Sequence, residues 1–163
     1  MPAKSHERYA RPLIDMSCLS IADTAYVCGL FDGEGTVGVY ETKNKTKNGG
    51  RRSAWHYEVQ IANTDIRIMK WLLDKIGGRM ALKSKGKEHW SQGYVWRLTG
   101  ENAVKFFIAI RPYSIIKKEQ IDVALEFRTL CKARGNLQTE YELAKKREMA
   151  GEIKLLKRVN YAI

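Results

Sequence analysis

The pattern of apolar and polar positions predicts a helix as the first regular element of the chain. Ser20, followed three residues later by Asp23, has the spacing of a capping box, so the helix is expected to begin there. It would run to about Phe31. From Ala25 to Phe31 the sequence has no polar face, which indicates burial on both sides. Residues 1–19, before this helix, are predicted to be a polar and partly ordered extension.

Two pairs of segments with a period of two residues predict two β-hairpins. The first pair is 35–44 and 53–63, joined by a connection at 43–52 that is rich in glycine, asparagine and lysine. The second pair is 79–85 and 93–100. The apolar positions expected to face inward are Val37, Val39, Trp55, Tyr57, Val59, Ile61, Met80, Leu82, Tyr94, Trp96 and Leu98.

Segments with helical periodicity make up most of the rest of the chain. A helix between the hairpins should end at Gly77–Gly78, and three more are predicted near 101–110, 115–133 and 138–158. The resulting order, αββαββα plus C-terminal helices, predicts an α+β fold in which helices cover one face of a four-stranded antiparallel sheet. We expect residues 20–163 to form a single domain.

The charge of the chain narrows the class of partner. Lys and Arg number 29 against 18 Asp and Glu, which gives a net charge of +11 and a pI near 9.6. This surplus points to a polyanion, with nucleic acid ahead of an acidic membrane surface. No apolar stretch approaches the roughly 20 residues that cross a bilayer. The N-terminal segment lacks the apolar middle of a signal peptide, so we expect an intracellular protein, in the cytoplasm or nucleoid, or in an organelle of a eukaryotic host.

The cysteines and histidines do not predict a zinc site. Cys18, Cys28 and Cys131 are odd in number and widely spaced among apolar residues, so they are expected to be core thiols. The three histidines are just as scattered, and no CxxC or HxxxH pair occurs.

The outward positions of the predicted sheet form a polar and basic face. Ordinary solvation would explain such a face. However, it mixes basic groups with amides, hydroxyls and aromatic groups that can contact base edges, and a two-stranded ribbon fits the DNA major groove. The candidate DNA-binding residues are Thr36, Tyr40, Thr42, Asn44, His56, Glu58, Gln60, Arg79, Lys83, Lys85 and Arg97.

Two carboxylates follow the predicted first helix, in the segment DGEG at 32–35. They add negative charge where the helix dipole is already negative. One interpretation is a helix-stop turn with both acids in water. The other is a site for a hard divalent cation, held by Asp32 or Glu34 beside the helix carbonyls, with Gly33 and Gly35 allowing close approach of the backbone.

The segment VCGLFDGEG at 27–35 resembles the nine-residue signature of the LAGLIDADG homing endonucleases. The similarity extends over most of 20–133 and includes the segments VQIANTDIRIMKWLLDKIG and RPYSIIKKEQ. The resemblance implies that Glu34, where the family commonly has Asp, binds metal together with the backbone carbonyl of Gly33. It also implies that Asn63, in place of the usual Gln, organises water, and that Arg67 and Lys117 are the basic residues of the active site.

The local sequence around Lys117 also marks that position. If Ser114 caps the helix that follows, Lys117 is at its third position, where the dipole and the capping box favour Glu. A cation there breaks a local rule, and such breaks often mark function. The alternative is a solvated lysine beside Lys118. Arg67 lies on the polar face of its predicted helix, so surface placement is an equally good interpretation of that residue.

Together these features predict a site-specific DNA endonuclease that hydrolyses phosphodiesters with Mg²⁺ or another divalent cation such as Mn²⁺. The resemblance implies cleavage of both strands across the minor groove with short 3′ overhangs. The start at Met1 and the lack of splicing motifs favour an intron-encoded protein. One alternative is a non-cleaving DNA- or RNA-binding relative or an intron-splicing maturase. Another, a basic ribosome-associated RNA-binding protein, leaves the carboxylate helix unexplained.

A single copy of the signature in the chain predicts a homodimer. Cleavage of a duplex requires chemistry on two strands, and a two-fold axis would supply two sites and demand a roughly palindromic target. Ala25 and Gly29 are small residues one turn apart, flanked by Cys28, and would let two helices approach closely. These three residues are the predicted dimer interface.

Overall fold

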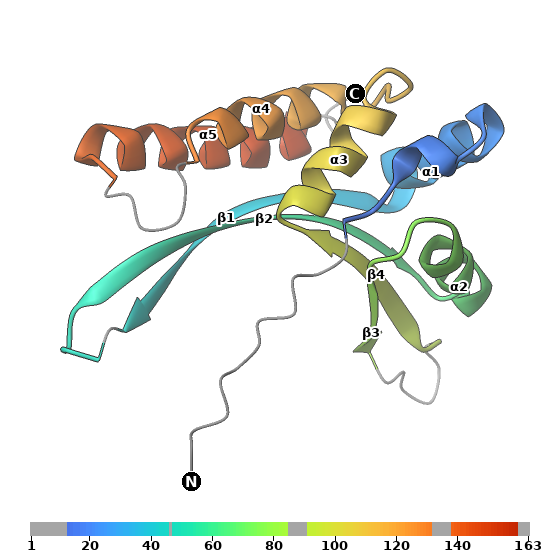
Figure 1. Cartoon of the computed structure of the whole chain (residues 1–163), viewed down its shortest axis with the longest axis horizontal. Coiled ribbons are helices and arrows are strands. Elements are labelled where there is room, and N and C mark those ends of the chain that lie inside the picture. The colour runs from blue at the N-terminus through green and yellow to red at the C-terminus, as the bar shows by residue number, and fades with distance from the viewer. Residues whose placement is uncertain (1–12, 46, 85–90, 132–137, 160–163) are drawn as a thin grey trace, which may run out of the picture.

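The computed structural model describes residues 13–45, 47–84, 91–131 and 138–159. Within these ranges the order of elements is the predicted αββαββα followed by a C-terminal helix (Figure 1), which confirms the α+β fold. The elements are a 3₁₀ turn at Met16–Cys18, then α1 Ile21–Glu34, β1 Gly35–Lys45, β2 Arg51–Asn63, α2 Ile66–Lys75, β3 Arg79–Ser84, β4 Gly93–Thr99, α3 Glu101–Ile110, α4 Lys118–Thr129 and α5 Glu140–Val159.

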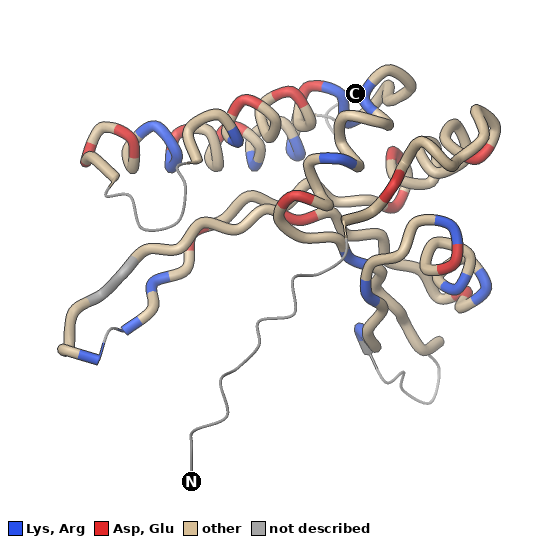
Figure 2. The backbone as a smooth tube through the Cα atoms, viewed as in Figure 1, with Lys and Arg blue, Asp and Glu red and all other residues tan. Residues whose placement is uncertain are grey.

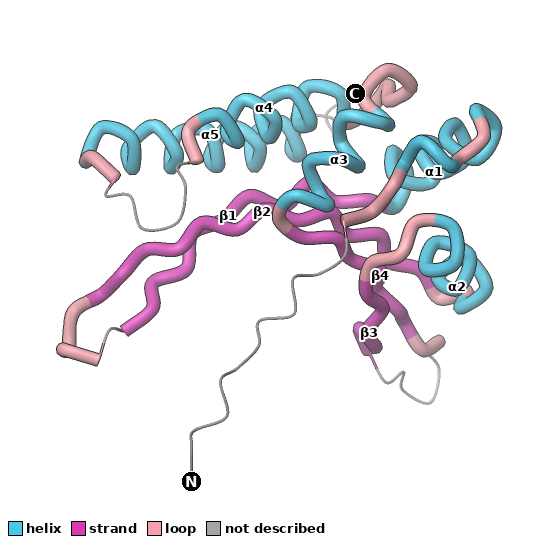
Figure 3. Tube along the Cα trace, viewed as in Figure 1, coloured by secondary structure: helices cyan, strands magenta, loops and turns pink. Residues whose placement is uncertain are grey.

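The four strands form one antiparallel sheet in the order β1-β2-β4-β3. Figure 3 shows α1, α3, α4 and α5 gathered over one side of this sheet, with the β1–β2 hairpin reaching far out beneath α4 and α5. The opposite side of the sheet carries no helix among the described residues. None of the described helices is long and apolar enough to cross a lipid bilayer.

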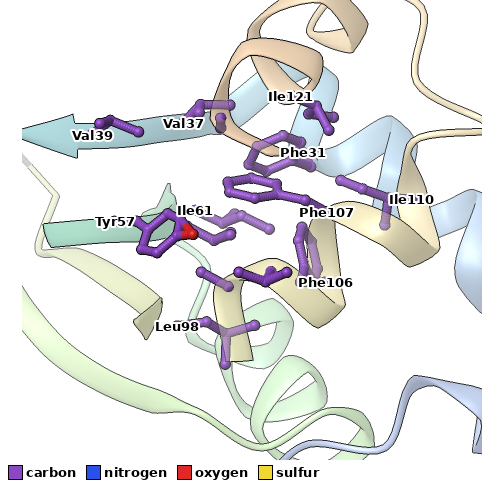
Figure 4. Close-up of a cluster of buried hydrophobic side chains, with 14 of the residues drawn as sticks. Phe31, Val37, Val39, Tyr57, Ile61, Leu98, Phe106, Phe107, Ile110 and Ile121 are labelled. Atoms are coloured by element: carbon purple, nitrogen blue, oxygen red, sulfur yellow. The ribbon is translucent and has the colours of Figure 1, made fainter. Parts of the chain in front are cut away.

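The core lies between the helices and the covered side of the sheet (Figure 4). Phe31 of α1 packs edge-on against Phe106 and Phe107 of α3, with ring centroids 5.5 and 6.2 Å apart. All three rings are fully buried. A Cβ at position 35 would lie 2.2 Å from Phe31 Cδ2, so only glycine can begin β1 directly against this ring. The C-terminal end of α1 is therefore fixed by the core.

Helix α1 begins as predicted, because Ser20 Oγ accepts a hydrogen bond from the Asp23 N–H at 3.0 Å. It ends three residues later than the predicted Phe31, so both carboxylates belong to its last turn. The prediction of burial on both sides is wrong for this chain alone. Val27 and Phe31 are fully buried, but the opposite side of the helix is exposed, with Tyr26 at 52%.

Several predicted boundaries and environments differ from the structure. β1 and β2 extend to Lys45 and from Arg51, so the hairpin connection is shorter than the predicted 43–52. Met80 and Leu82 were expected to be buried but are 36% and 45% exposed, because β3 is an edge strand with an irregular register after Leu82. Helix α4 spans a shorter stretch than 115–133. Cys18 is exposed, so it is not a core thiol.

Candidate functional site

The carboxylate of Asp32 is buried and fastens the segment before α4 to the end of α1. It accepts a hydrogen bond from Ser114 Oγ at 2.6 Å and three more from the backbone N–H groups of residues 115–117, at 2.8 to 3.2 Å. Burial by itself raises the pKa of Asp32, but these hydrogen bonds outweigh it and hold the pKa below the usual value. Asp32 is thus a structural acid, a role that the sequence analysis did not assign to it.

Lys117 is buried beside the hydrogen-bonded carboxylate of Asp32. Its ammonium Nζ donates to the backbone carbonyl of Asp32, and its pKa is lowered by burial, in part offset by the Asp32 and Glu34 carboxylates. Ser114 does not cap α4 as predicted. It bonds Asp32 instead, and Lys117 directly precedes the first helical residue. The structure therefore places the Lys117 ammonium at the C-terminal end of α1, and Lys117 is the N-cap residue of α4 instead of its predicted third residue.

Glu34, the last residue of α1, is exposed. No described side chain forms a hydrogen bond or ion pair with it, and its charge acts on Lys117. The final carbonyls of a helix have no intrahelical donors, so a carboxylate and carbonyl oxygens come together at this end. Hard oxygen donors of this kind suit Mg²⁺, which binds one or two carboxylates and completes its shell with water and phosphate. A cluster of three or more acidic, histidine or cysteine side chains is absent from the described residues.

Asn63 lies at the same end of the sheet as Glu34. Gly35 pairs with Ile61, so the last residue of β2 lies beside the junction of α1 and β1. Its Oδ1 accepts a hydrogen bond from the Asp65 N–H at 2.8 Å, which begins the turn into α2. The side-chain oxygen that was predicted to organise water is thus engaged in this turn.

Arg67 is on the surface of α2, with 87% of its side chain exposed. It pairs with Asp65 at 2.6 Å, and this pairing raises the pKa of the guanidinium. It lines a hollow of about 400 Å³ together with Tyr26 and Trp71, whose rings pack edge-on. The structure brings Arg67 alongside α1, but no described contact joins it to Glu34 or Lys117.

The open side of the sheet carries the predicted DNA-binding residues. Tyr40 and His56 stack with centroids 5.3 Å apart, and His56 Nε2 is 2.8 Å from Thr42 Oγ1. Figure 2 shows Lys and Arg at the far end of the β1–β2 hairpin and on the β3–β4 hairpin. The candidates at exposed positions on these strands are Thr36, Tyr40, Asn44, His56, Arg79, Lys83 and Arg97.

Two candidates differ from expectation, and a third is not placed by the structure. Glu58 is 7% exposed, because Gly38 on the neighbouring strand leaves room for its side chain to lie against the sheet. Lys83 sits where β3 has one residue more than β4, so strict alternation does not fix its direction. Lys85 lies outside the described residues.

The predicted dimer interface divides between two sides of α1. Ala25 and Gly29 are exposed, and a Cβ at Gly29 or Gly33 would meet nothing within 4 Å. Cys28 is buried at 1%, and its Sγ donates to the Ile110 carbonyl at 3.5 Å. Its assignment to a dimer interface is therefore wrong, because it packs against α3 within the chain.

Comparison with protein-family models and with curated proteins finds no match for the sequence. Solved structures do match. The homing endonuclease I-CvuI, in complex with the I-CreI target, has 14% identity and a TM-score of 0.67, over 83% of this chain and 82% of that chain. The homing endonuclease I-TnaI has 25% identity and a TM-score of 0.60, over 83% of this chain and 93% of that chain.

A third match relates this chain to half of a longer protein. The LAGLIDADG homing endonuclease I-SmaMI, bound to cleaved DNA, has 19% identity and a TM-score of 0.64, over 88% of this chain but only 47% of that chain. Each of the three matches extends over more than four-fifths of this chain. The chain therefore has the α+β fold of the LAGLIDADG homing endonucleases.

Proposed function

We propose that this protein is a site-specific DNA endonuclease of the homing type, which hydrolyses one phosphodiester in each strand of its target as a homodimer. The observation that carries the proposal is that Glu34 and the Lys117 ammonium both lie at the C-terminal end of α1, where the polar face of the sheet begins. Structures of the same fold in complex with DNA support it.

Glu34 and the backbone carbonyl of Gly33 would hold a divalent cation, Mg²⁺ in the first instance. When bound, such an ion activates water and stabilises negative charge on the phosphate and the leaving oxygen. The Lys117 ammonium, held by the Asp32 carbonyl, supplies a second positive group for this charge. Asn63, through its amide, and Arg67, through its exposed guanidinium, would contact water and phosphate around the reacting group.

The dimensions of the sheet suit the proposed substrate. β1 has 11 residues, which at about 3.3 Å each span roughly 36 Å, or about one turn of B-DNA. A β-ribbon of this length would follow the major groove over one half-site. Because β1 begins next to Glu34, its first outward residues would lie nearest the cleaved bond and the hairpin end farthest from it.

A homodimer would supply the second active site. The exposed Ala25 and Gly29 leave one side of α1 free for the close approach of another helix. Small residues at such positions favour close packing of two helix backbones, and a two-fold axis between the helices would bring both Glu34 side chains to one centre. The target would then be a pseudo-palindrome of about two DNA turns.

Glu34→Gln tests the catalytic assignment. The substitution removes a charge but keeps the size of an exposed side chain, so the protein should fold and bind DNA in Ca²⁺ while Mg²⁺-dependent cleavage falls by orders of magnitude. The substrate is the intronless allele of the gene that the element interrupts, or a duplex selected from a randomised pool. Near-normal cleavage by the variant would eliminate Glu34 as a metal ligand.

A non-cleaving relative of the same fold, acting as a DNA- or RNA-binding protein or a splicing maturase, is the second candidate. Two contacts support it. Asn63 accepts a hydrogen bond from the backbone N–H of Asp65, and Arg67 pairs with the Asp65 carboxylate, so both interactions are made with Asp65 and not with Glu34. The same assay separates the two. Tight, sequence-specific binding without cleavage by the wild type, in both Mg²⁺ and Mn²⁺, would favour the second candidate.

A further inference from the structure

A buried carboxylate lies in the middle of the open side of the sheet, where water would be expected on every polar group. The Glu58 side chain is 9% exposed. It lies across Gly38, where a Cβ would come within 2.6 Å of Glu58 Cγ. On a surface proposed to bind a polyanion, a negative charge opposes binding, so its presence requires a compensating role.

The neighbours of Glu58 suggest what this role is. Gln60 Nε2 donates to Oε1, and Arg97 Nε lies 3.5 Å from Oε2. Tyr40 also borders the carboxylate, since burial and the Glu58 charge together raise the pKa of Tyr40. Groups from β1, β2 and β4 therefore surround the carboxylate, and little of it is exposed to a base.

Arg97 differs from Glu58 in that 44% of its side chain remains exposed. The guanidinium nitrogen nearest the carboxylate is Nε, at 3.5 Å, so the ion pair does not require the terminal Nη1 and Nη2 groups. Together these two groups can form the planar fork that bonds guanine O6 and N7. Arg97 pairs with Gln60 on β2 and with Arg79 on β3. Together with Arg79 it also borders a hollow of about 550 Å³.

We infer that Arg97 reads a guanine in each half-site and that Glu58 is a positioning residue that orients the guanidinium fork of Arg97. This inference rests on the proposed function. The register places this guanine in the inner part of the half-site. Thr36 pairs with Gln60, which pairs with Arg97, and Thr36 is only two residues from Glu34. The outer bases would instead meet the residues near the hairpin end.

The neighbouring arginine provides a matched comparison. Arg79 lies directly opposite Arg97 on β3 and is exposed. No described acid forms an ion pair with Arg79, so its full charge is available for phosphate. The Glu58 carboxylate offsets the charge of Arg97, which weakens its attraction to the backbone and favours a base contact.

The experiment selects duplexes from a randomised DNA pool in Ca²⁺ and compares the wild type with Arg97→Lys, Glu58→Gln and Arg79→Ala. The wild type should require guanine at one pair of symmetric inner positions, and another base there should weaken binding by roughly 5- to 150-fold. Arg97→Lys, which lacks the fork, should remove this preference and leave the other positions unchanged. Arg79→Ala should weaken binding to all sequences alike and reduce the salt slope by about one.

Glu58→Gln distinguishes positioning from a purely structural role. It should weaken the preference for guanine while steepening the salt dependence, because the released Arg97 charge turns to phosphate. If thermal unfolding shows that this variant is not folded, Arg97→Lys alone decides whether Arg97 reads guanine. Arg97→Lys with an unchanged base preference at every position would overturn the inference and leave the endonuclease proposal standing. A pool from which the wild type enriches no sequence would overturn both.

Discussion

The two acids at the end of α1 should separate experimentally into a structural and a catalytic one. Asp32 accepts four hydrogen bonds in a buried setting, whereas Glu34 is exposed and bonds no described side chain. Asp32→Asn should therefore destabilise the fold, and Glu34→Gln should leave its stability unchanged. The two substitutions are chemically matched, since each exchanges a carboxylate for an amide of the same size.

The size of the Asp32 effect follows from its partners. An asparagine keeps one oxygen and directs an NH₂ donor toward groups that are themselves donors, so about half of the four hydrogen bonds are lost. Hydrogen bonds to a charged group contribute about 1.5–3 kcal/mol each, and an unsatisfied buried donor costs about 1–3 kcal/mol. Because such terms are not additive, we expect Asp32→Asn to lower the free energy of unfolding by about 3 kcal/mol. Ser114→Ala, which removes one of the four, should cost about 2 kcal/mol.

The effect should depend on pH. The folded pKa of Asp32 is below its unfolded value, so the stabilisation is complete above the unfolded pKa of about 3.9 and is lost as the pH falls through the folded pKa. Urea unfolding at fixed protein concentration, at pH 7 and at pH 3, measures both quantities. A loss below about 0.5 kcal/mol for Asp32→Asn at pH 7, or an equal loss for Glu34→Gln, would refute the division of roles.

Three further predictions concern the proposed dimer, the DNA-binding face and the junction of α1 with β1. Gly29→Leu should fold, because a Cβ at this position meets nothing within 4 Å. It should abolish dimerisation and cleavage together. Sedimentation of the wild type as a monomer, with and without DNA, would contradict the proposed dimer. Lys83→Ala should weaken binding and lower the salt slope by about one if it contacts phosphate. Gly35→Ala should lower the melting temperature because of the contact with Phe31, whereas Gly33→Ala should not.

The sequence predicted the class and order of the elements because their signals are local. The Ser20 cap and the period-two alternation of β1 and β2 depend on neighbouring residues only. The errors arose where distant contacts override local preference. The ladder of β1 and β2 continues into both ends of the segment 43–52 predicted to be loop, since Asn44 pairs with Arg52 and Lys45 with Arg51. Met80 has the pattern of a buried residue but lies on an edge strand.

The candidate site was predictable only in part. The resemblance drew attention to Glu34 and Lys117, and the structure brings their charges together. The roles of Asp32 and Glu58 were missed for a common reason, since each depends on a partner that the local sequence does not reveal. The donors to Asp32 lie 82 to 85 residues later in the chain. Glu58 is buried because a glycine, Gly38, happens to lie opposite it on β1.

The apolar surface of α1 can be understood by dividing the helix into sides. One side, with Val27 and Phe31, is fully buried and fixes the helix in the core. The other, with Ala25 and Gly29, has the same apolar character but is not covered by any of the residues that the structure describes. A helix that is apolar all round is stable in water only when both sides are covered. The proposed homodimer would supply the missing cover, and the same contact would bring a second Glu34 to the first, as cleavage of two strands requires.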